Sequence, residues 1–435
     1  MTWKPEHTKS AAALLVLALI IVLVQRGLWK GGVFHEGRSN DFRAYHLAAQ
    51  GVWQRDLVPA FRDETRPYMY PPTFAILISP LGLLSYRAAL VLWTVLNALL
   101  VVYIFRRLDR MLALPLPIVA RVAGFLLIYR LLESDFANGN ANVTVLAIVL
   151  AGFDWARRHD AKTAGGILSV AILAKVTPVL ILPWIVYRRR WNMLMGVLVG
   201  LLLLGLVLPG VVLGPGGAAH AWKTWKSVTI DHIDPTSRSY AQEPASGYEP
   251  GQSLRTLLHR LLRDSDATAH DERTVSIHLA DLPKEAVDMV YLTAAAFILL
   301  LVLYAAWRRA PGARLGWRPE EIAAACAVMV LLAPISRKAH FVALWPAAVL
   351  GFEAWRLSAN RLLERTGLTL WLLALVLVVG TSPGLVGRDL STWLLAYCPM
   401  SWAALALVIL VSHPRLYPRG GLRSSALGEK SCGGT

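Results

Sequence analysis

Residues 86–110 read YRAALVLWTVLNALLVVYIFRRLDR, an apolar run of helical length that ends in a cluster of charged residues. An α-helix needs about 20 apolar residues to cross the hydrocarbon core of a bilayer. Similar runs recur along the chain, which is 56% hydrophobic. A membrane β-barrel would instead show short segments that alternate polar and apolar residues. The sequence therefore predicts an all-α polytopic membrane protein with about 10 to 13 membrane segments.

Residues 72–84, PTFAILISPLGLL, are apolar but do not fit a simple crossing. At about 13 residues the run is short for a membrane span, and Pro80 interrupts it. A short broken segment at membrane depth is tolerated where it packs against protein or lies at the interface. We therefore expect a re-entrant or interfacial helix here.

Residues 164–187 form a second unusual stretch, because basic residues flank the apolar run at both ends. Both ends therefore favour the same side of the membrane. The sequence Lys175-Val-Thr-Pro178 interrupts the run. Proline removes a backbone donor and disfavours helical conformation at the residue before it. We expect a broken pair of half-helices, 165–175 and 178–187, that enters the membrane and returns.

The net charge of +16 predicts how the protein lies in the membrane. Lys and Arg next to membrane spans are retained on the cytoplasmic side, so their excess does not indicate a nucleic-acid partner. With the N-terminus in the cytoplasm, every arginine-rich cluster falls on that side. These clusters are 106–110, 157–162, 188–190, 308–318, 356–365 and 413–423. We expect a multi-pass protein of the cell membrane, with both termini cytoplasmic.

The chain reads as one integral membrane domain, residues 1–412. Ala11–Val24 is followed by no small-residue cleavage site, so we expect an uncleaved first span. Residues 413–435 are rich in Gly and Ser, and we expect a disordered cytoplasmic tail. Two polar loops, 28–71 and 214–285, then share the outer face.

The outer loop 28–71 holds the first candidate for chemistry, Asp41. A carboxylate at the membrane boundary can act as a general base toward an acceptor hydroxyl. The structural alternative is a helix cap, because Ser39-Asn40-Asp41 precedes a helix-like sequence. Tyr45 and Tyr70 are candidate sugar or acceptor contacts, although aromatic residues are also common interface anchors.

Four basic side chains are candidates for binding a phosphate. Lys175 lies among apolar residues, where an ammonium is costly and is a functional candidate by default. Its alternatives are snorkelling to the interface or pairing with a carboxylate. Arg337, Lys338 and His340 form one turn on the outer face, where the charge trend leaves few basic residues. Such a cluster can stabilise a phosphate whose charge develops as a bond to it breaks.

The segment Asn138-Gly-Asn140-Ala-Asn142 opens a membrane span. Its side chains either cap that helix or bind sugar hydroxyls, and the sequence favours neither. The chain shows no glycine-rich phosphate loop and no cluster of acids at metal-ligand spacing. Its three cysteines show no zinc-site spacing. We therefore expect no metal and no cofactor.

Several short elements occur in an order that resembles a known family. They are Asp41-Phe-Arg-Ala-Tyr45, Tyr68-Met-Tyr-Pro-Pro72, Leu77-Ile-Ser-Pro-Leu81, Gly139-Asn-Ala-Asn142, Ala174-Lys-Val-Thr-Pro178 with Arg188-Arg-Arg-Trp191, and the late Ser336 to His340. In this order, over most of residues 38–350, they resemble glycosyltransferase family 87. That family belongs to the GT-C glycosyltransferases, and its members are similar to polyprenol-phosphate-mannose-dependent mannosyltransferases.

The resemblance implies a GT-C-like helical bundle and an inverting hexosyltransferase that acts at the outer face. The implied donor is a polyprenyl-phosphate-linked sugar, with mannose as the expected hexose, and the acceptor is a lipid or a glycan. Asp41 becomes the expected base, and Lys175 and His340 the expected donor-phosphate contacts. Family members tend to have Gly-Gln-x-x-Asn where this chain has Gly139-Asn-Ala-Asn142, so the role of that stretch stays open. Residues 54–66 show no family pattern, so the acceptor can differ.

A transporter or lipid flippase is the alternative from another functional class. Broken helices and a lysine within a membrane segment are also features of transporters. Against this alternative, the polar candidates gather on one face of the expected bundle rather than at its midplane.

Overall fold

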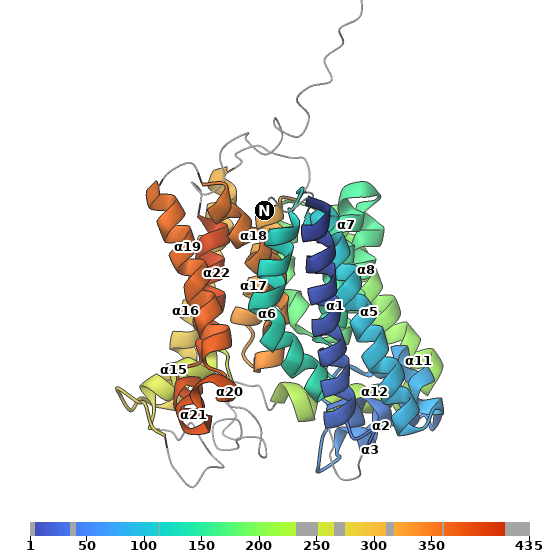
Figure 1. The fold of residues 1–435 in the computed structure, drawn as a ribbon. Coiled ribbons are helices and arrows are strands. Elements are labelled where there is room, and N and C mark those ends of the chain that lie inside the picture. The colour runs from blue at the N-terminus through green and yellow to red at the C-terminus, as the bar shows by residue number, and fades with distance from the viewer. Residues whose placement is uncertain are drawn as a thin grey trace, which may run out of the picture.

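The computed structural model describes residues 5–34, 41–112, 114–231, 251–264, 275–309, 317–358 and 361–413. These residues form helices, turns and loops, with no strand among them (Figure 1). The tail expected at 413–435 lies outside the described residues except for His413.

Five described helices are long and apolar enough to cross a membrane. They are α1 (Pro5–Lys30), α5 (Tyr86–Leu112), α10 to α11 (Trp191–Leu213), α16 (Lys284–Arg309) and α19 with its extension (Arg361–Gly380). Two bent pairs bring the number up to seven: α6 (Ile118–Asn138) with α7 (Asn142–Arg158), and α21 (Arg388–Ala396) with α22 (Pro399–Ser412). The predicted polytopic helical architecture is confirmed, and the protein is a multi-pass membrane protein.

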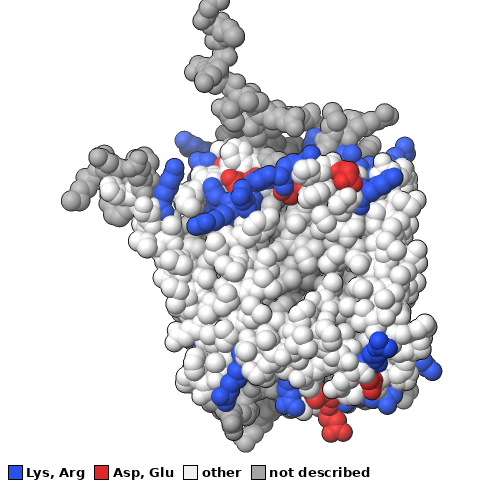
Figure 2. Space-filling model, turned by 90° about the vertical axis from the view of Figure 1, so that its right-hand side faces the viewer, with Lys and Arg blue, Asp and Glu red and all other residues white. Residues whose placement is uncertain are grey.

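The helices run between two faces of the molecule (Figure 1). The N-terminus lies at one end, which we call the N-terminal face. The opposite end, the loop face, carries α2 (Asp41–Trp53), α3 (Val58–Phe61), α12 (Pro215–Trp225), α15 (Leu254–Leu262), α20 (Pro383–Val386) and α21. Figure 2 shows Lys and Arg gathered along the rim of the N-terminal face, above a broad band without charged side chains. A charge-free band between two polar rims is the surface expected of a membrane-spanning bundle.

The broken pair predicted at 164–187 is confirmed. Helix α8 (Ala161–Ala174) ends at Lys175, and the chain continues as a short 3-10 turn (Thr177–Ile181) and α9 (Leu182–Tyr187). Helix α10 begins directly afterwards and lies along α8 in the same direction, because Gly165 meets Met193 and Gly200 meets Ser169. A Cβ at Gly165 would overlap the Met193 carbonyl oxygen, so the glycine permits this close approach. The two half-helices therefore place Lys175 at the end of α8 that faces the loop face.

The segment 72–84 forms α4 (Pro72–Leu77) and a 3-10 turn (Ser79–Leu83). Both elements are too short to cross a bilayer, as predicted. They pack against α2, and the Nε1–H of Trp53, the last residue of α2, donates to the Ser79 carbonyl oxygen at 2.7 Å. Leu83 is 66% exposed, which suits a segment that lies at a membrane interface.

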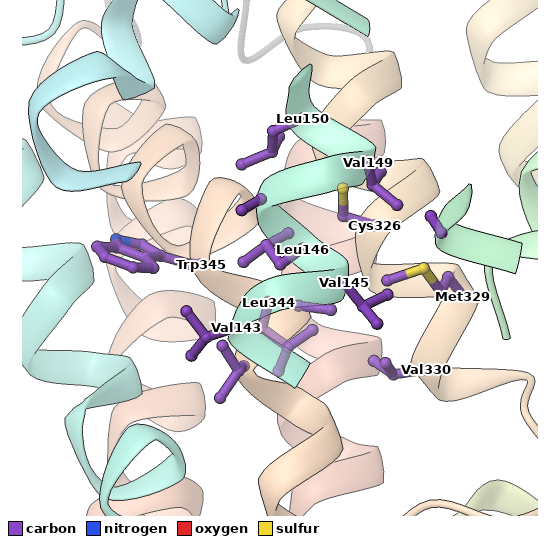
Figure 3. Close-up of a cluster of buried hydrophobic side chains, with 14 of the residues drawn as sticks. Val143, Val145, Leu146, Val149, Leu150, Cys326, Met329, Val330, Leu344 and Trp345 are labelled. Atoms are coloured by element: carbon purple, nitrogen blue, oxygen red, sulfur yellow. The ribbon is translucent and has the colours of Figure 1, made fainter. Parts of the chain in front are cut away.

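The core connects α7 with α17 (Pro319–Leu331) and with the turn that leads into α18 (Trp345–Arg356). Figure 3 shows Leu146 and Val149 of α7 among Cys326 and Met329 of α17 and Trp345 of α18. All of these side chains are buried. This packing holds the loop-face end of α7 in a fixed position relative to the turn that precedes α18.

Candidate active site

Asp41 is the first residue of α2 and lies on the loop face. Its Oδ1 accepts a hydrogen bond of 2.9 Å from the Arg66 guanidinium, and its side chain is 25% exposed. Residues 39–40 of the proposed capping segment lie outside the described residues. A carboxylate in the first turn of a helix is favoured by the helix dipole. Asp41 is therefore held in place and still open to a substrate.

Asp63 builds the loop that carries Arg66. Its Oδ1 accepts hydrogen bonds from the backbone N–H groups of Thr65, at 3.0 Å, and of Arg66, at 2.7 Å. An aspartate that binds the backbone two residues on stabilises a tight turn. Asp63 thereby contributes to the position of Arg66, and Arg66 to that of Asp41.

Tyr45 lies one helical turn after Asp41, so both side chains occupy one face of α2. The Tyr45 hydroxyl donates to the Tyr70 hydroxyl at 2.6 Å, and the two rings meet edge-on with centroids 5.0 Å apart. Burial first, and then the charge of Asp41, raise the pKa of Tyr70 above its ordinary value. The Tyr70 hydroxyl therefore stays protonated at neutral pH, beside the candidate base.

Lys175 reaches into this site from the break after α8. Its ammonium donates a hydrogen bond to Oδ1 of Asn142, at the start of α7. The same ammonium lies 5.8 Å from the centroid of the Tyr70 ring, a cation–π distance. Asn142 in turn donates through Nδ2 to Oδ1 of Asp135, at 2.7 Å. Lys175 is thus paired through an amide with a buried carboxylate.

Asp135 is a site residue that the sequence analysis did not identify. It lies near the end of α6 and is only 1% exposed. Gly139 ends α6 in the left-handed conformation, with φ of 64°, which lets the chain reverse into α7. The sequence signal is an acid that precedes such a glycine by four residues and is followed by a second span.

Asn142 joins this group, whereas Asn140 lies beside it. The Asn140 backbone N–H donates to the Asp135 carbonyl oxygen at 2.9 Å, and the residue is 6% exposed. Asn140 lines a small cavity together with Asp135, Trp93, Thr94, Asn97, Phe136 and Gly139. Its amide is therefore adjacent to the acid of the group, and the structure does not place it against Lys175.

Arg337 and His340 approach the group from the turn before α18. The charge of Arg337 acts on both Tyr70 and Lys175, and Lys175 and Arg337 both act on His340. The third member of the predicted cluster, Lys338, is buried at 7% exposure. The structure thus brings Arg337 and His340 near Lys175, and their contact with a donor phosphate stays a prediction.

Residues 252–263 hold this turn in place. The Gln252 backbone N–H donates to the Ser336 carbonyl oxygen at 2.6 Å, and the Ser253 hydroxyl donates to the Pro334 carbonyl oxygen at 3.0 Å. Helix α15 forms in this segment, and its Arg255 and Arg260 are buried. Arg260 donates to the carbonyl oxygens of Leu395 and Ala396, at 3.2 and 3.0 Å.

Replacing Arg255 with methionine is expected to lower the free energy of unfolding by about 3–5 kcal/mol, because it leaves a buried carboxylate without its main partner. Arg255 binds both carboxylate oxygens of Asp288, at 2.6 and 3.0 Å, and the two side chains are 2% and 4% exposed. Thermal unfolding in detergent checks the change. The exposed pair Lys226–Asp231 supplies the control, since Lys226→Met should cost about 0–1 kcal/mol. Equal losses in both variants would contradict a stabilising role for the buried pair.

Among the described residues, no three His, Cys, Asp or Glu side chains lie close enough to hold a metal ion. The charged groups around Tyr70 are Lys175 and Arg337 on the cationic side, and Asp41 and Asp135 on the anionic side. Chemically, this arrangement can bind a phosphate with its cations and remove a proton with Asp41.

A model of glycosyltransferase family 87 matches residues 68–334, which is more than half of the 435-residue chain. The chain belongs to glycosyltransferase family 87. The matched range includes Tyr70, Asp135, Asn142 and Lys175, whereas Asp41 precedes it and the turn with Arg337 and His340 follows it. Together with the membrane helices, family membership makes this protein a membrane glycosyltransferase.

Two solved structures of ArnT from Cupriavidus metallidurans are similar to this family-87 glycosyltransferase. The apo form is 13% identical with a TM-score of 0.37, and the alignment covers 93% of this chain and 78% of ArnT. The form bound to undecaprenyl phosphate is 13% identical with a TM-score of 0.35, over 92% and 77% of the two chains. No curated protein matches the chain.

Proposed function

We propose that this family-87 glycosyltransferase transfers a hexose, with mannose expected, from a polyprenyl-phosphate donor to a hydroxyl of a lipid or glycan acceptor. The observation that carries the proposal is the convergence on Tyr70 of a carboxylate and a cationic group. Lys175 lies over the Tyr70 ring, and the charges of Asp41 and Arg337 both act on the Tyr70 hydroxyl. A lipid phosphate leaves a sugar more readily when cations stabilise its charge, and Lys175 and Arg337 can supply them. An acceptor hydroxyl needs a base to take its proton, and Asp41 can serve as that base.

The chemistry follows from these roles. Asp41 takes the proton of the acceptor hydroxyl as its oxygen attacks the anomeric carbon of the donor sugar. The bond between that carbon and the phosphate oxygen breaks, and its electron pair leaves with the polyprenyl phosphate. Lys175, Arg337 and His340 stabilise the negative charge that develops there. Attack opposite the leaving group inverts the anomeric configuration.

Arg66 and the tyrosine pair complete the acceptor side in this proposal. Arg66 binds Oδ1 of Asp41, so Oδ2 is the oxygen that we expect to accept the proton. Tyr45 and Tyr70, whose hydroxyls are hydrogen-bonded to each other, are positioned to contact the sugar or the acceptor.

The site belongs to the outer face of the cell membrane in this proposal. Lys and Arg are concentrated on the rim of the N-terminal face, and such residues are retained in the cytoplasm (Figure 2). The loop face, with Asp41 and the short helices, then lies outside, and both termini are cytoplasmic. Family membership and the gathering of the polar candidates at the loop face favour this transferase over the transporter or flippase.

Transfer of label is the direct test. The purified protein in lipid vesicles, supplied with radiolabelled polyprenyl-phosphate-mannose and a membrane lipid extract, is expected to form a new labelled lipid or glycan. The rate should depend on the concentration of the donor, and a nucleotide sugar should not replace it. Absence of transfer from mannose, glucose and galactose donors alike would contradict the proposed donor class.

A further inference from the structure

The side-chain amide of Asn142 connects Asp135 and Lys175 by two hydrogen bonds. The Asp135 carboxylate can only accept hydrogen bonds, and the Lys175 ammonium can only donate them. The amide of Asn142 lies between them, donating through Nδ2 to Asp135 and accepting through Oδ1 from Lys175. This charge pattern fixes which end of the amide faces the lysine. Asp135 therefore dictates that Lys175 meets an oxygen and not an NH2 group.

The start of α7 also stabilises the Asp135 carboxylate. The backbone N–H groups of Asn142 and Val143, in the first turn of α7, also stabilise the charge of the carboxylate. The N-terminus of a helix is a favourable position for an anion. The acid thus holds the side chain of Asn142 at the start of α7.

A purely structural cap would not need a carboxylate at this depth. Asn or Ser caps a helix about as well as Asp, without burying a charge. Oδ2 of Asp135 is buried and has no hydrogen-bond partner within the described part of the chain, which adds to the cost of burial. The charge itself is therefore the property that needs an explanation.

Lys175 supplies that explanation. Among the charges that act on Lys175, that of Asp135 has the largest effect, ahead of Asp41 and of the repulsion by Arg337. Without a nearby anion, an ammonium beside a guanidinium in a poorly hydrated site is unfavourable. The anion allows two cations to remain close to each other at one binding position.

We infer that Asp135 is a positioning residue that acts through Asn142 to hold Lys175 ready for the phosphate of the lipid donor. The inference rests on the proposed function, because it assigns the phosphate to Lys175. In this role Asp135 does not touch the substrate.

Binding of undecaprenyl phosphate to the full-length protein in lipid nanodiscs tests the inference without turnover. Asp135→Asn keeps the shape and removes the charge, and is expected to weaken binding by about tenfold or more, since hydrogen bonds to charged groups contribute about 1.5–3 kcal/mol. Glu133→Gln is the matched control, because Glu133 lies two residues earlier on α6 and pairs with the exposed Arg26 at 2.7 Å. Binding by the control should be unchanged, and Asn142→Ala, which breaks the relay at the amide, should reproduce the loss.

A double-mutant cycle separates positioning from direct contact. In a Lys175→Met background, Asp135→Asn should weaken binding by less than about twofold, because its effect passes through the lysine. An undiminished effect in that background would overturn the inference, as would unchanged binding in Asp135→Asn. If Lys175→Met alone left binding unchanged, Lys175 would not hold the phosphate of the bound lipid, and the inference would fail with that assignment. If only Lys175→Met lost binding, the relay would fail and the phosphate site would stand.

Discussion

Replacing Asp41 with asparagine is expected to lower the transfer rate by about 10²- to 10⁴-fold, the usual contribution of a general base. Asparagine keeps the size of the side chain and an acceptor oxygen for Arg66, which now donates to Oδ1 of Asp41 at 2.9 Å. It cannot take a proton from the acceptor hydroxyl. The loss should therefore appear in kcat, while binding of undecaprenyl phosphate stays within a few-fold of the native protein.

Asp56→Asn is the matched control for this prediction. Asp56 lies in the same polar region, is exposed, and accepts a hydrogen bond from the Val58 backbone N–H at 2.9 Å, which an asparagine oxygen can replace. Transfer by this variant should equal that of the native protein. Equal transfer by the Asp41 variant would remove Asp41 from the mechanism. Loss of lipid-phosphate binding together with activity would instead assign Asp41 to donor binding.

The membrane helices could be predicted because their signal is local. The length and composition of each apolar run can be read directly from its own residues. The broken pair was equally readable, since Pro178 and the flanking basic residues lie within the stretch they define. Lys175 stood out for the same reason, as a charge among apolar neighbours.

The contacts that build the site were not readable, because they join segments distant in sequence. Asn142 meets Lys175 across 33 residues, and nothing in either stretch indicates the other. Asp135 was missed because an acid near the end of a span resembles an ordinary interfacial residue. Only the reversal at Gly139, which brings the start of α7 back onto the carboxylate, shows that the acid is buried.

Helix α15 shows the same limit in its arginines. Its basic and apolar residues fall on two faces, which is the pattern of a basic amphipathic surface helix. Arg255 instead finds Asp288, 33 residues away, and Arg260 finds backbone carbonyls about 135 residues away. An amphipathic pattern predicts that a helix has a polar and an apolar face. It does not predict whether the polar face meets water or buried partners, because those partners come from distant parts of the chain.

Lys175→Met is expected to lower kcat/KM for the lipid-linked donor by about 10²- to 10³-fold, the cost of removing one group that stabilises a developing oxyanion. Methionine retains much of the packing of the lysine stem but carries no charge. Both the ground-state phosphate and the transition state lose a cation, so the KM for the donor should rise and kcat should fall. Binding of undecaprenyl phosphate should weaken in parallel.

The control for this prediction lies on the same helix. Lys162 is exposed near the start of α8, at the N-terminal face, so Lys162→Met changes net charge equally without touching the site. Its donor kinetics should match those of the native protein. If the two lysine variants behaved alike, the phosphate would have to be held by Arg337 and His340 alone. If kcat fell in Lys175→Met with donor binding unchanged, Lys175 would act only on the charge that develops as the glycosidic bond breaks.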